Sequence, residues 1–190
     1  MVLPIYLYGH PVLRTETKLV TPDFPDLDKL IQNMKDTMYA TEGIGIAAPQ
    51  VGVSLRLVYI DVDCLKEELP ELAGVNMVLI NPEVTVDETA PLVNREEGCL
   101  SVPDIHESVK RHERIHLRYF DEQWVEHEVD IEGYLARVVQ HECDHLDQTL
   151  FTDRVEGYRK VMIRGKLANI AKGKIECRYR VRTAPKVHKK

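Results

Sequence analysis

Two histidines and a glutamate lie within one short segment of the sequence, His141-Glu142-Cys143-Asp144-His145. Residues four apart lie on the same face of an α-helix, so the imidazoles of His141 and His145 can reach one cation. Glu142 then lies beside the first imidazole, where its carboxylate can contact a water on that cation. This H-E-x-x-H pattern predicts two metal ligands and a general base.

The flanking residues indicate that the helix carrying this segment is buried. They are mainly apolar: Tyr134, Leu135, Val138, Val139 and Leu146. Imidazole and carboxylate groups that are removed from water need compensating partners. The alternative is a polar helix face that carries these residues by chance, and the apolar flanks favour metal binding over it.

A catalytic divalent site commonly takes three protein ligands and one water, so a third ligand must come from another part of the chain. The metzincin pattern would need glycine at Gln148 and histidine at Phe151, which excludes that class. Thermolysin-like enzymes use a glutamate from a later helix, and Glu156 is too close to the motif for that arrangement. Cysteine is the leading candidate.

Among the four cysteines, Cys99 is the best candidate for the third ligand. Cys143 points about 200° around the helix from His141 and cannot share its metal. Cys64 falls in a polar loop and Cys177 in a basic segment, whereas Cys99 follows a glycine in a turn-rich segment. We therefore choose Cys99.

Three segments together resemble the signature motifs of the peptide deformylases, in that family's order. They are Gly43-Ile44-Gly45-Ile46-Ala47-Ala48-Pro49-Gln50, Glu97-Gly98-Cys99-Leu100-Ser101 and Gln140-His141-Glu142-Cys143-Asp144-His145. The resemblance implies an enzyme that removes the formyl group from the N-terminal formyl-methionine of nascent chains. It also implies one divalent metal ion, usually Fe(2+), with Zn(2+), Ni(2+) or Co(2+) as possible substitutes.

The resemblance also assigns roles to individual residues. The metal ligands would be Cys99, His141 and His145, with Glu142 as the general base. The side-chain amide of Gln50 and the backbone N–H of Leu100 would hold the oxyanion, and one such donor is typically worth about 3 kcal/mol. Backbone groups of residues 43–45 would pair with the substrate peptide.

An apolar slot should accept the methionine side chain, and we place Ile44, Tyr134 and Val138 there by analogy and because a thioether fills irregular apolar space well. The alternative is that all three residues belong to the core. One departure from the family pattern is visible at the rim of this pocket. Many relatives carry arginine seven residues after the motif cysteine, and this chain carries His106.

Hydrophobic periodicity predicts an α+β fold with strands segregated from a few helices. We expect a scaffold helix from about Leu27 to Ala40, capped by Asp26 or Asp28, the metal-binding helix from Gly133, and a helix over 158–170. Strands are expected over 55–62, 77–86 with a break near Asn81-Pro82, 108–120 and 124–131, with an extended piece over 92–103. Antiparallel sheets would surround the metal-binding helix, as the resemblance implies.

The composition predicts one catalytic domain, residues 1–170, followed by a basic tail, residues 171–190, that is partly disordered. Residues 1–153 carry 12 Lys and Arg against 29 Asp and Glu, whereas residues 154–190 carry 13 against 2. The tail would bind an anionic partner such as the ribosome, or fold back on the acidic body. No membrane span, signal peptide or paired cysteine spacing is apparent, so we expect a cytoplasmic protein.

Two other functions remain open at this point. A metallopeptidase or amidase could use the same helix on a different carbonyl, and activity on an N-acetyl or internal peptide bond would favour it. A non-catalytic RNA- or ribosome-binding protein with a structural metal is the second, and a closed site with four ligands would favour that.

Overall fold

A computed structural model describes residues 1–185 of the chain. The helices are α1 Leu27–Ala40, α2 Gly133–Leu146, α3 Phe151–Arg154 and α4 Gly157–Ala171. The strands are β1 Ile5–Tyr6, β2 Gly45–Ala47, β3 Leu57–Asp61, β4 Asn76–Val86, β5 Leu92–Cys99, β6 Val102–His112, β7 Arg114–Phe120, β8 Glu126–Glu132 and β9 Val181–Arg182. The α+β prediction is confirmed.

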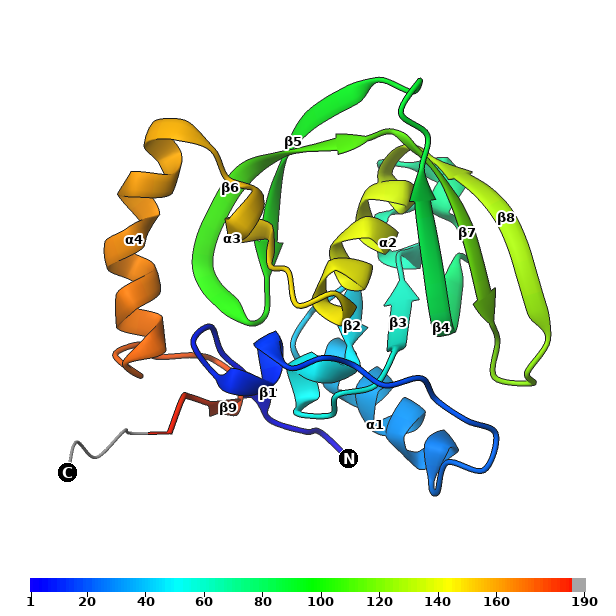
Figure 1. Cartoon of the computed structure of the whole chain (residues 1–190), viewed down its shortest axis with the longest axis horizontal. Helices are drawn as coiled ribbons and strands as arrows, with labels where there is room; N and C mark the ends of the chain where they lie inside the picture. Colours follow the sequence, from blue (N-terminus) through cyan, green and yellow to red (C-terminus); the bar gives the residue numbers. More distant parts are fainter. Residues whose placement is uncertain (186–190) are drawn as a thin grey trace.

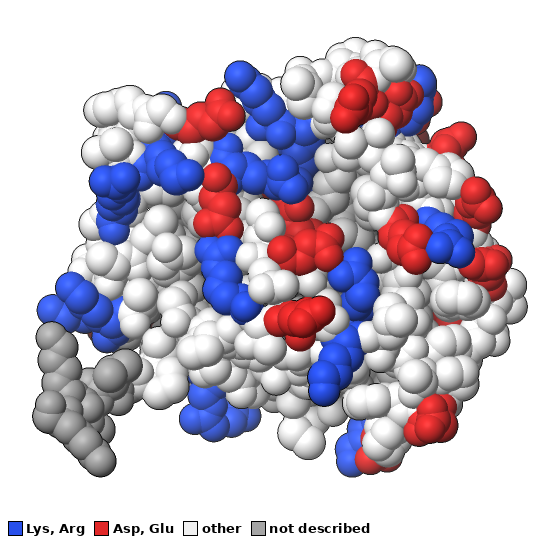
Figure 2. Space-filling model, viewed as in Figure 1, with Lys and Arg blue, Asp and Glu red and all other residues white. Residues whose placement is uncertain are grey.

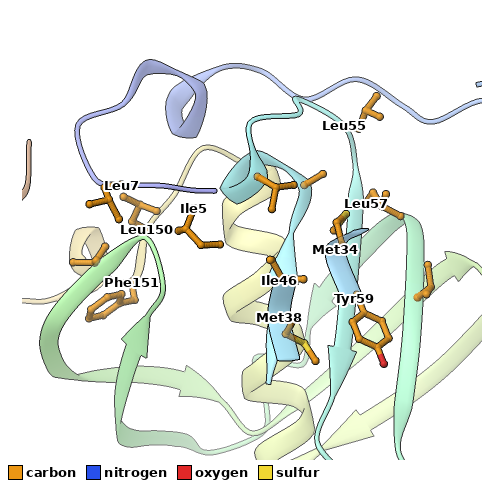
Figure 3. Close-up of a cluster of buried hydrophobic side chains, with 14 of the residues drawn as sticks. Ile5, Leu7, Met34, Met38, Ile46, Leu55, Leu57, Tyr59, Leu150 and Phe151 are labelled. Carbon is orange, nitrogen blue, oxygen red and sulfur yellow. The ribbon is translucent and has the colours of Figure 1, made fainter. Parts of the chain in front are cut away.

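The largest sheet has the strand order β2-β3-β4-β7-β8, and every neighbouring pair in it is antiparallel. Strand β3 is buried on both faces because its side chains alternate between two apolar clusters. Leu57 and Tyr59 face the cluster that includes Met34 and Met38 of α1, part of which is drawn in Figure 3. Residues Val58 and Ile60 face the cluster that includes residues of α2.

Helix α2 lies between this sheet and the hairpin formed by β5 and β6 (Figure 1). Its sheet-facing side carries Ala136, Val139, Cys143 and Leu146, at spacings of three and four that form one helical stripe. The opposite side carries Arg137, His141 and Asp144, which all bond to the hairpin. The helix is therefore enclosed on both sides, as its apolar flanks predicted.

Two local predictions need correction. Asp26 does precede α1, but with a φ of 58° it makes no capping hydrogen bond through its side chain, and Asp28 lies inside the helix. The break expected near Asn81-Pro82 does not end β4; the pairing of β4 with β7 changes register between Ile80 and Glu83 instead. The Asn81 side chain bonds both backbone polar groups of Val20, which compensates for the local loss of pairing.

The C-terminal segment returns to the start of the chain. After α4, β9 pairs with β1 in parallel, with Ile5 opposite Val181 and Tyr6 opposite Arg182 (Figure 1). Part of the segment expected to be disordered is thus in contact with the body, and residues 186–190 lie outside the described range. The division into residues 1–170 and 171–190 stays a prediction. No helix within residues 1–185 is long and apolar enough to cross a membrane.

Candidate metal centre and its cleft

The structure brings the three predicted metal ligands together. Cys99 at the end of β5 meets His141 and His145 of α2, and one donor atom of each lies within 4.8 Å of the others. The Cys99 Sγ atom is 3.3 Å from His145 Nε2. A thiolate and two imidazoles are a suitable donor set for zinc or iron, and three protein ligands leave a position for water. These residues fit a catalytic divalent metal.

The orientation of His141 is fixed by Glu97, a residue for which the sequence predicted no role. Its Oε2 atom is 2.9 Å from His141 Nδ1, which leaves Nε2 for the metal. Arg111 Nε and Arg137 Nη1 each donate to Glu97 Oε1 at 2.6 Å. Burial alone would raise the pKa of Glu97, but its bonds to Arg111 and His141 hold the pKa well below the usual range. The carboxylate therefore stays charged.

The same network continues through Asp144. Arg111 Nη1 donates to Asp144 Oδ2 at 2.9 Å, and Arg154 binds the same carboxylate. Arg111 is 3% exposed, so it links two carboxylates in an interior where an unpaired charge would be costly. Asp144 thus ties α2 to β6 and α3.

The two histidines of the candidate donor set have opposite pKa shifts. Burial and the neighbouring His141 lower the pKa of His145 well below its usual value, which favours the neutral form that binds metals. Burial also acts to lower the pKa of His141, but hydrogen bonds with Cys99 and Glu97 raise it. The raised pKa favours the protonated form of His141, whereas a bound cation would favour its neutral form.

The carboxylate of Glu142 is buried, and Glu142 lines the same cleft as Cys99 and His141. Burial raises the pKa of Glu142 to about 7, and among the described residues its Oε2 atom has no hydrogen-bond partner. A Cβ atom on Gly45 would lie 2.6 Å from Glu142 Oε1, so only glycine leaves room for the carboxylate there. The backbone of β2 therefore approaches the Glu142 side chain closely at this position.

The Gln50 amide has a defined orientation. Its Oε1 atom accepts a hydrogen bond from the Ala47 backbone N–H at 2.8 Å, and its Nε2 atom lies 3.5 Å from Cys99 Sγ. The amide N–H groups therefore face the donor cluster. Leu100 directly follows Cys99 in the turn between β5 and β6, and both residues line a cleft.

A cleft of about 980 Å³ opens beside these residues. It is lined by all five residues assigned to substrate binding, Gly43, Ile44, Gly45, Tyr134 and Val138. His106 also lines it, with its ring so close to Gly98 that a Cβ atom there would lie 2.7 Å from the ring. The predicted substrate residues therefore line the same cleft as Cys99, His141 and Glu142. His145 does not line the cleft, but its Nε2 atom contacts Cys99 Sγ.

Four further lining residues, Glu176, Cys177, Arg178 and Tyr179, come from the C-terminal segment. These four residues could not be identified from the sequence because their segment has no motif and no clear periodicity. Glu97 and Arg137 were missed for another reason, since their partners come from different elements. A charged residue between apolar Ala136 and Val138 was the available signal for Arg137, because a buried guanidinium requires an acidic partner.

Comparison with known proteins gives a consistent result. The family model for polypeptide deformylase matches residues 2–161. A peptide deformylase of Christiangramia forsetii is 44% identical over 189 residues, which cover 96% of each chain. One from Salinibacter ruber is 45% identical over 183 residues, covering 94% of this chain and 93% of the relative.

Solved structures of the same kind resemble the whole fold. The crystal structure of peptide deformylase from Thermus thermophilus has a TM-score of 0.77 at 41% identity, covering 89% of this chain and 97% of that one. A structure from Synechococcus elongatus in complex with actinonin has a TM-score of 0.74 at 36% identity, covering 96% of this chain and 92% of that one.

Matched cysteine substitutions test the donor set. Cys99→Ala should abolish stoichiometric metal binding because it removes one of three ligands, whereas Cys143→Ala should retain it because Cys143 faces the sheet. The measurement is metal content per chain after dialysis, with unfolding followed in parallel. Equal metal content in the two variants would exclude Cys99 as a ligand.

Proposed function

The chain belongs to the peptide deformylase family, and from this premise we propose how its own residues carry out the reaction. The protein is a metal-dependent hydrolase that removes the formyl group from the N-terminal formyl-methionine of nascent polypeptides. The observation that carries the proposed roles is the juxtaposition of a buried Glu142 carboxylate with the Cys99, His141 and His145 donors at the cleft.

Cys99, His141 and His145 hold the metal, and Glu142 is the general base. A divalent metal bound there would supply Lewis acidity, which lowers the pKa of a bound water towards about 7. Glu142 takes the proton of the attacking water at its carboxylate and then delivers a proton to the departing amine. A pKa of Glu142 near 7 suits both transfers, since the group must accept and release a proton at the same pH.

Negative charge that develops on the formyl oxygen is stabilised by Gln50 and Leu100. The Gln50 amide already faces the donor cluster because Ala47 holds its oxygen. The Leu100 backbone N–H is the second donor. Preorganised donors of this kind need no rearrangement as the charge develops, which is the source of their catalytic effect.

The substrate backbone extends the sheet at β2. Within residues 1–185, β2 pairs only with β3, and its residue Gly45 lines the cleft together with Gly43. An extended peptide can add to such an open strand edge through main-chain hydrogen bonds, with specificity left to side-chain pockets. The methionine side chain enters the apolar slot formed by Ile44, Tyr134 and Val138.

We propose Fe(2+) as the resident metal. The family resemblance supports this choice, and the thiolate ligand is compatible with it. Zn(2+), Ni(2+) or Co(2+) would fit the same three donors, because affinity alone does not favour iron. Purification without oxygen is required for a fair measurement, since both a thiolate and ferrous iron are open to oxidation.

The first experiment measures formate release from a formyl-Met tripeptide by anaerobically purified protein. Glu142→Gln should lower kcat by at least about a hundredfold because proton transfer by a positioned group contributes that much. Metal content should equal that of the wild type. An N-acetyl-Met tripeptide serves as the control substrate, and its hydrolysis at a comparable rate would instead favour a general amidase.

A matched pair of substitutions tests the methionine slot. Val138 lines the cleft, whereas its neighbour Val139 is fully buried against the sheet. Val138→Ala should shift the ratio of kcat/KM for formyl-Phe over formyl-Met tripeptides by about tenfold, because it removes apolar bulk from the slot. Val139→Ala should leave that ratio unchanged. Similar ratios in all three proteins would mean that Val138 belongs only to the core.

We also propose that the basic residues of α4 and of the C-terminal segment after it bind the ribosome. This would place the enzyme in the cytoplasm beside its nascent substrate. Figure 2 shows Lys and Arg side chains along the side of the molecule where α4 lies. The exposed basic residues of this region include Arg159, Lys160, Arg164, Lys166, Lys172 and Lys174. Phosphate contacts by such residues give salt-sensitive binding to RNA.

Charge reversal tests the ribosome proposal without removing the segment that lines the cleft. The combined substitutions Arg164→Glu, Lys166→Glu and Lys172→Glu should weaken ribosome binding and reduce its dependence on salt. Each lost phosphate contact makes the plot of log binding constant against log salt concentration less steep. Activity on the tripeptide should not change. The control reverses three exposed lysines on the acidic body, Lys18, Lys29 and Lys110. Equal losses of binding in both variants would refute a specific site on α4.

A further inference from the structure

The turn that follows β5 is held in place by two hydrogen bonds from distant parts of the chain. Tyr179 Oη donates to the carbonyl oxygen of Leu100 at 2.8 Å. The backbone N–H of Tyr8 donates to the carbonyl oxygen of Ser101 at 2.7 Å. These are consecutive carbonyl groups in the turn that directly follows Cys99, so both peptide planes after Leu100 and Ser101 are restrained.

The two donors come from opposite ends of the chain, and those ends are bonded to each other. Ile5 N–H donates to Arg180 O and Leu7 N–H donates to Arg182 O, each at 2.9 Å. We call residues 5–8 and 177–182 the terminal clamp. At its far end, a Cβ atom on Gly9 would lie 2.7 Å from Ala171 Cβ, so the N-terminal loop also packs directly on the end of α4.

The N-terminal half of the clamp is anchored in the core. Ile5 and Leu7 are fully buried, and in Figure 3 both lie beside Leu150 and Phe151. The C-terminal half takes its position from this anchor through the β1–β9 pair, and its Cys177 and Tyr179 side chains pack on the same cluster. The clamp is therefore attached to the rigid interior and not only to the turn.

Tyr179 faces the cleft as well as the turn. It lines the cleft with Glu176, Cys177 and Arg178. Burial raises the pKa of Tyr179, so its hydroxyl keeps the proton that it donates to Leu100. The Leu100 side chain is restrained too, because a Cβ atom on Gly43 would lie only 3.1 Å from Leu100 Cδ1. Leu100 is thus fixed through its carbonyl group and its side chain.

We infer that Tyr179 is a positioning residue for deformylation, which acts by holding the Cys99-Leu100-Ser101 turn so that the Leu100 N–H points at the reacting carbonyl. This inference rests on the proposed role of the Leu100 N–H. It also makes the C-terminal segment part of the active site. A segment that only carried charge to a partner would leave the chemistry of short substrates unaffected.

Tyr179→Phe removes only the hydroxyl group and keeps the ring that packs on the core. The kcat for a formyl-Met tripeptide should fall by about three- to tenfold, the range that one neutral hydrogen bond sets, while KM and metal content stay at wild-type values. Amide hydrogen exchange over residues 97–103 should become faster in the same variant. Tyr158→Phe, at an exposed tyrosine of α4, is the matched control.

Two truncated chains provide an independent measurement. A chain that ends at Pro185 keeps the β1–β9 pair and the hydrogen bond from Tyr179 to Leu100. It should have wild-type kcat and wild-type amide hydrogen exchange over residues 97–103. A chain that ends at Lys174 lacks β9 and Tyr179, and it should lose more kcat than Tyr179→Phe and exchange faster over residues 97–103. Both chains are compared at equal metal content and after their unfolding midpoints have been measured.

The outcomes separate this inference from the proposed function. Wild-type kcat or wild-type exchange over residues 97–103 in Tyr179→Phe would overturn the positioning role, as would full tripeptide activity in the chain that ends at Lys174. If the wild type itself releases no formate, the proposed function fails. Exchange over residues 97–103 still reports on the clamp in that case, because it requires no turnover.

Discussion

The enclosure of α2 on both sides is the constraint on which the rest of the structure depends. One side of the helix is apolar and packs on the sheet, whereas the other places imidazole, carboxylate and guanidinium groups in a largely buried layer between the helix and the hairpin. Charges in such a place must be paired, because removing one partner of a buried pair typically costs about 3–5 kcal/mol. Glu97, Arg111, Arg137 and Asp144 satisfy this requirement and in doing so fix the hairpin against the helix.

This pairing also sets the chemistry of the centre. The carboxylate that neutralises Arg111 and Arg137 is the one that orients His141, so the same groups hold the structure together and support the candidate metal site. Glu142, one residue further along the helix, receives no such partner among the described residues and is left with a raised pKa. The two carboxylates thus have pKa values shifted in opposite directions because their surroundings differ.

Small residues provide the room that this dense arrangement needs. Gly45 allows the edge strand of the sheet to approach Glu142, and Gly43 leaves room for the side chains of Leu100 and Met38. The cleft is therefore lined by the backbone of the glycine-containing segment as well as by ionisable and apolar side chains. Part of the remaining wall comes from the C-terminal segment, so the region with the strongest positive charge in the sequence also borders the cleft.

The sequence by itself determined the elements with local periodicity and the residues with motif spacing: α1, α2, α4, most strands, and the helix-borne residues His141, Glu142 and His145. Cys99 was reached by eliminating the other cysteines. Tertiary structure alone decided the Glu97 network and the pairing of β1 with β9. The physical reason is that helical and strand periods record which side of an element is buried, whereas a bond such as Tyr179 to Leu100 joins segments whose separation leaves no periodic trace.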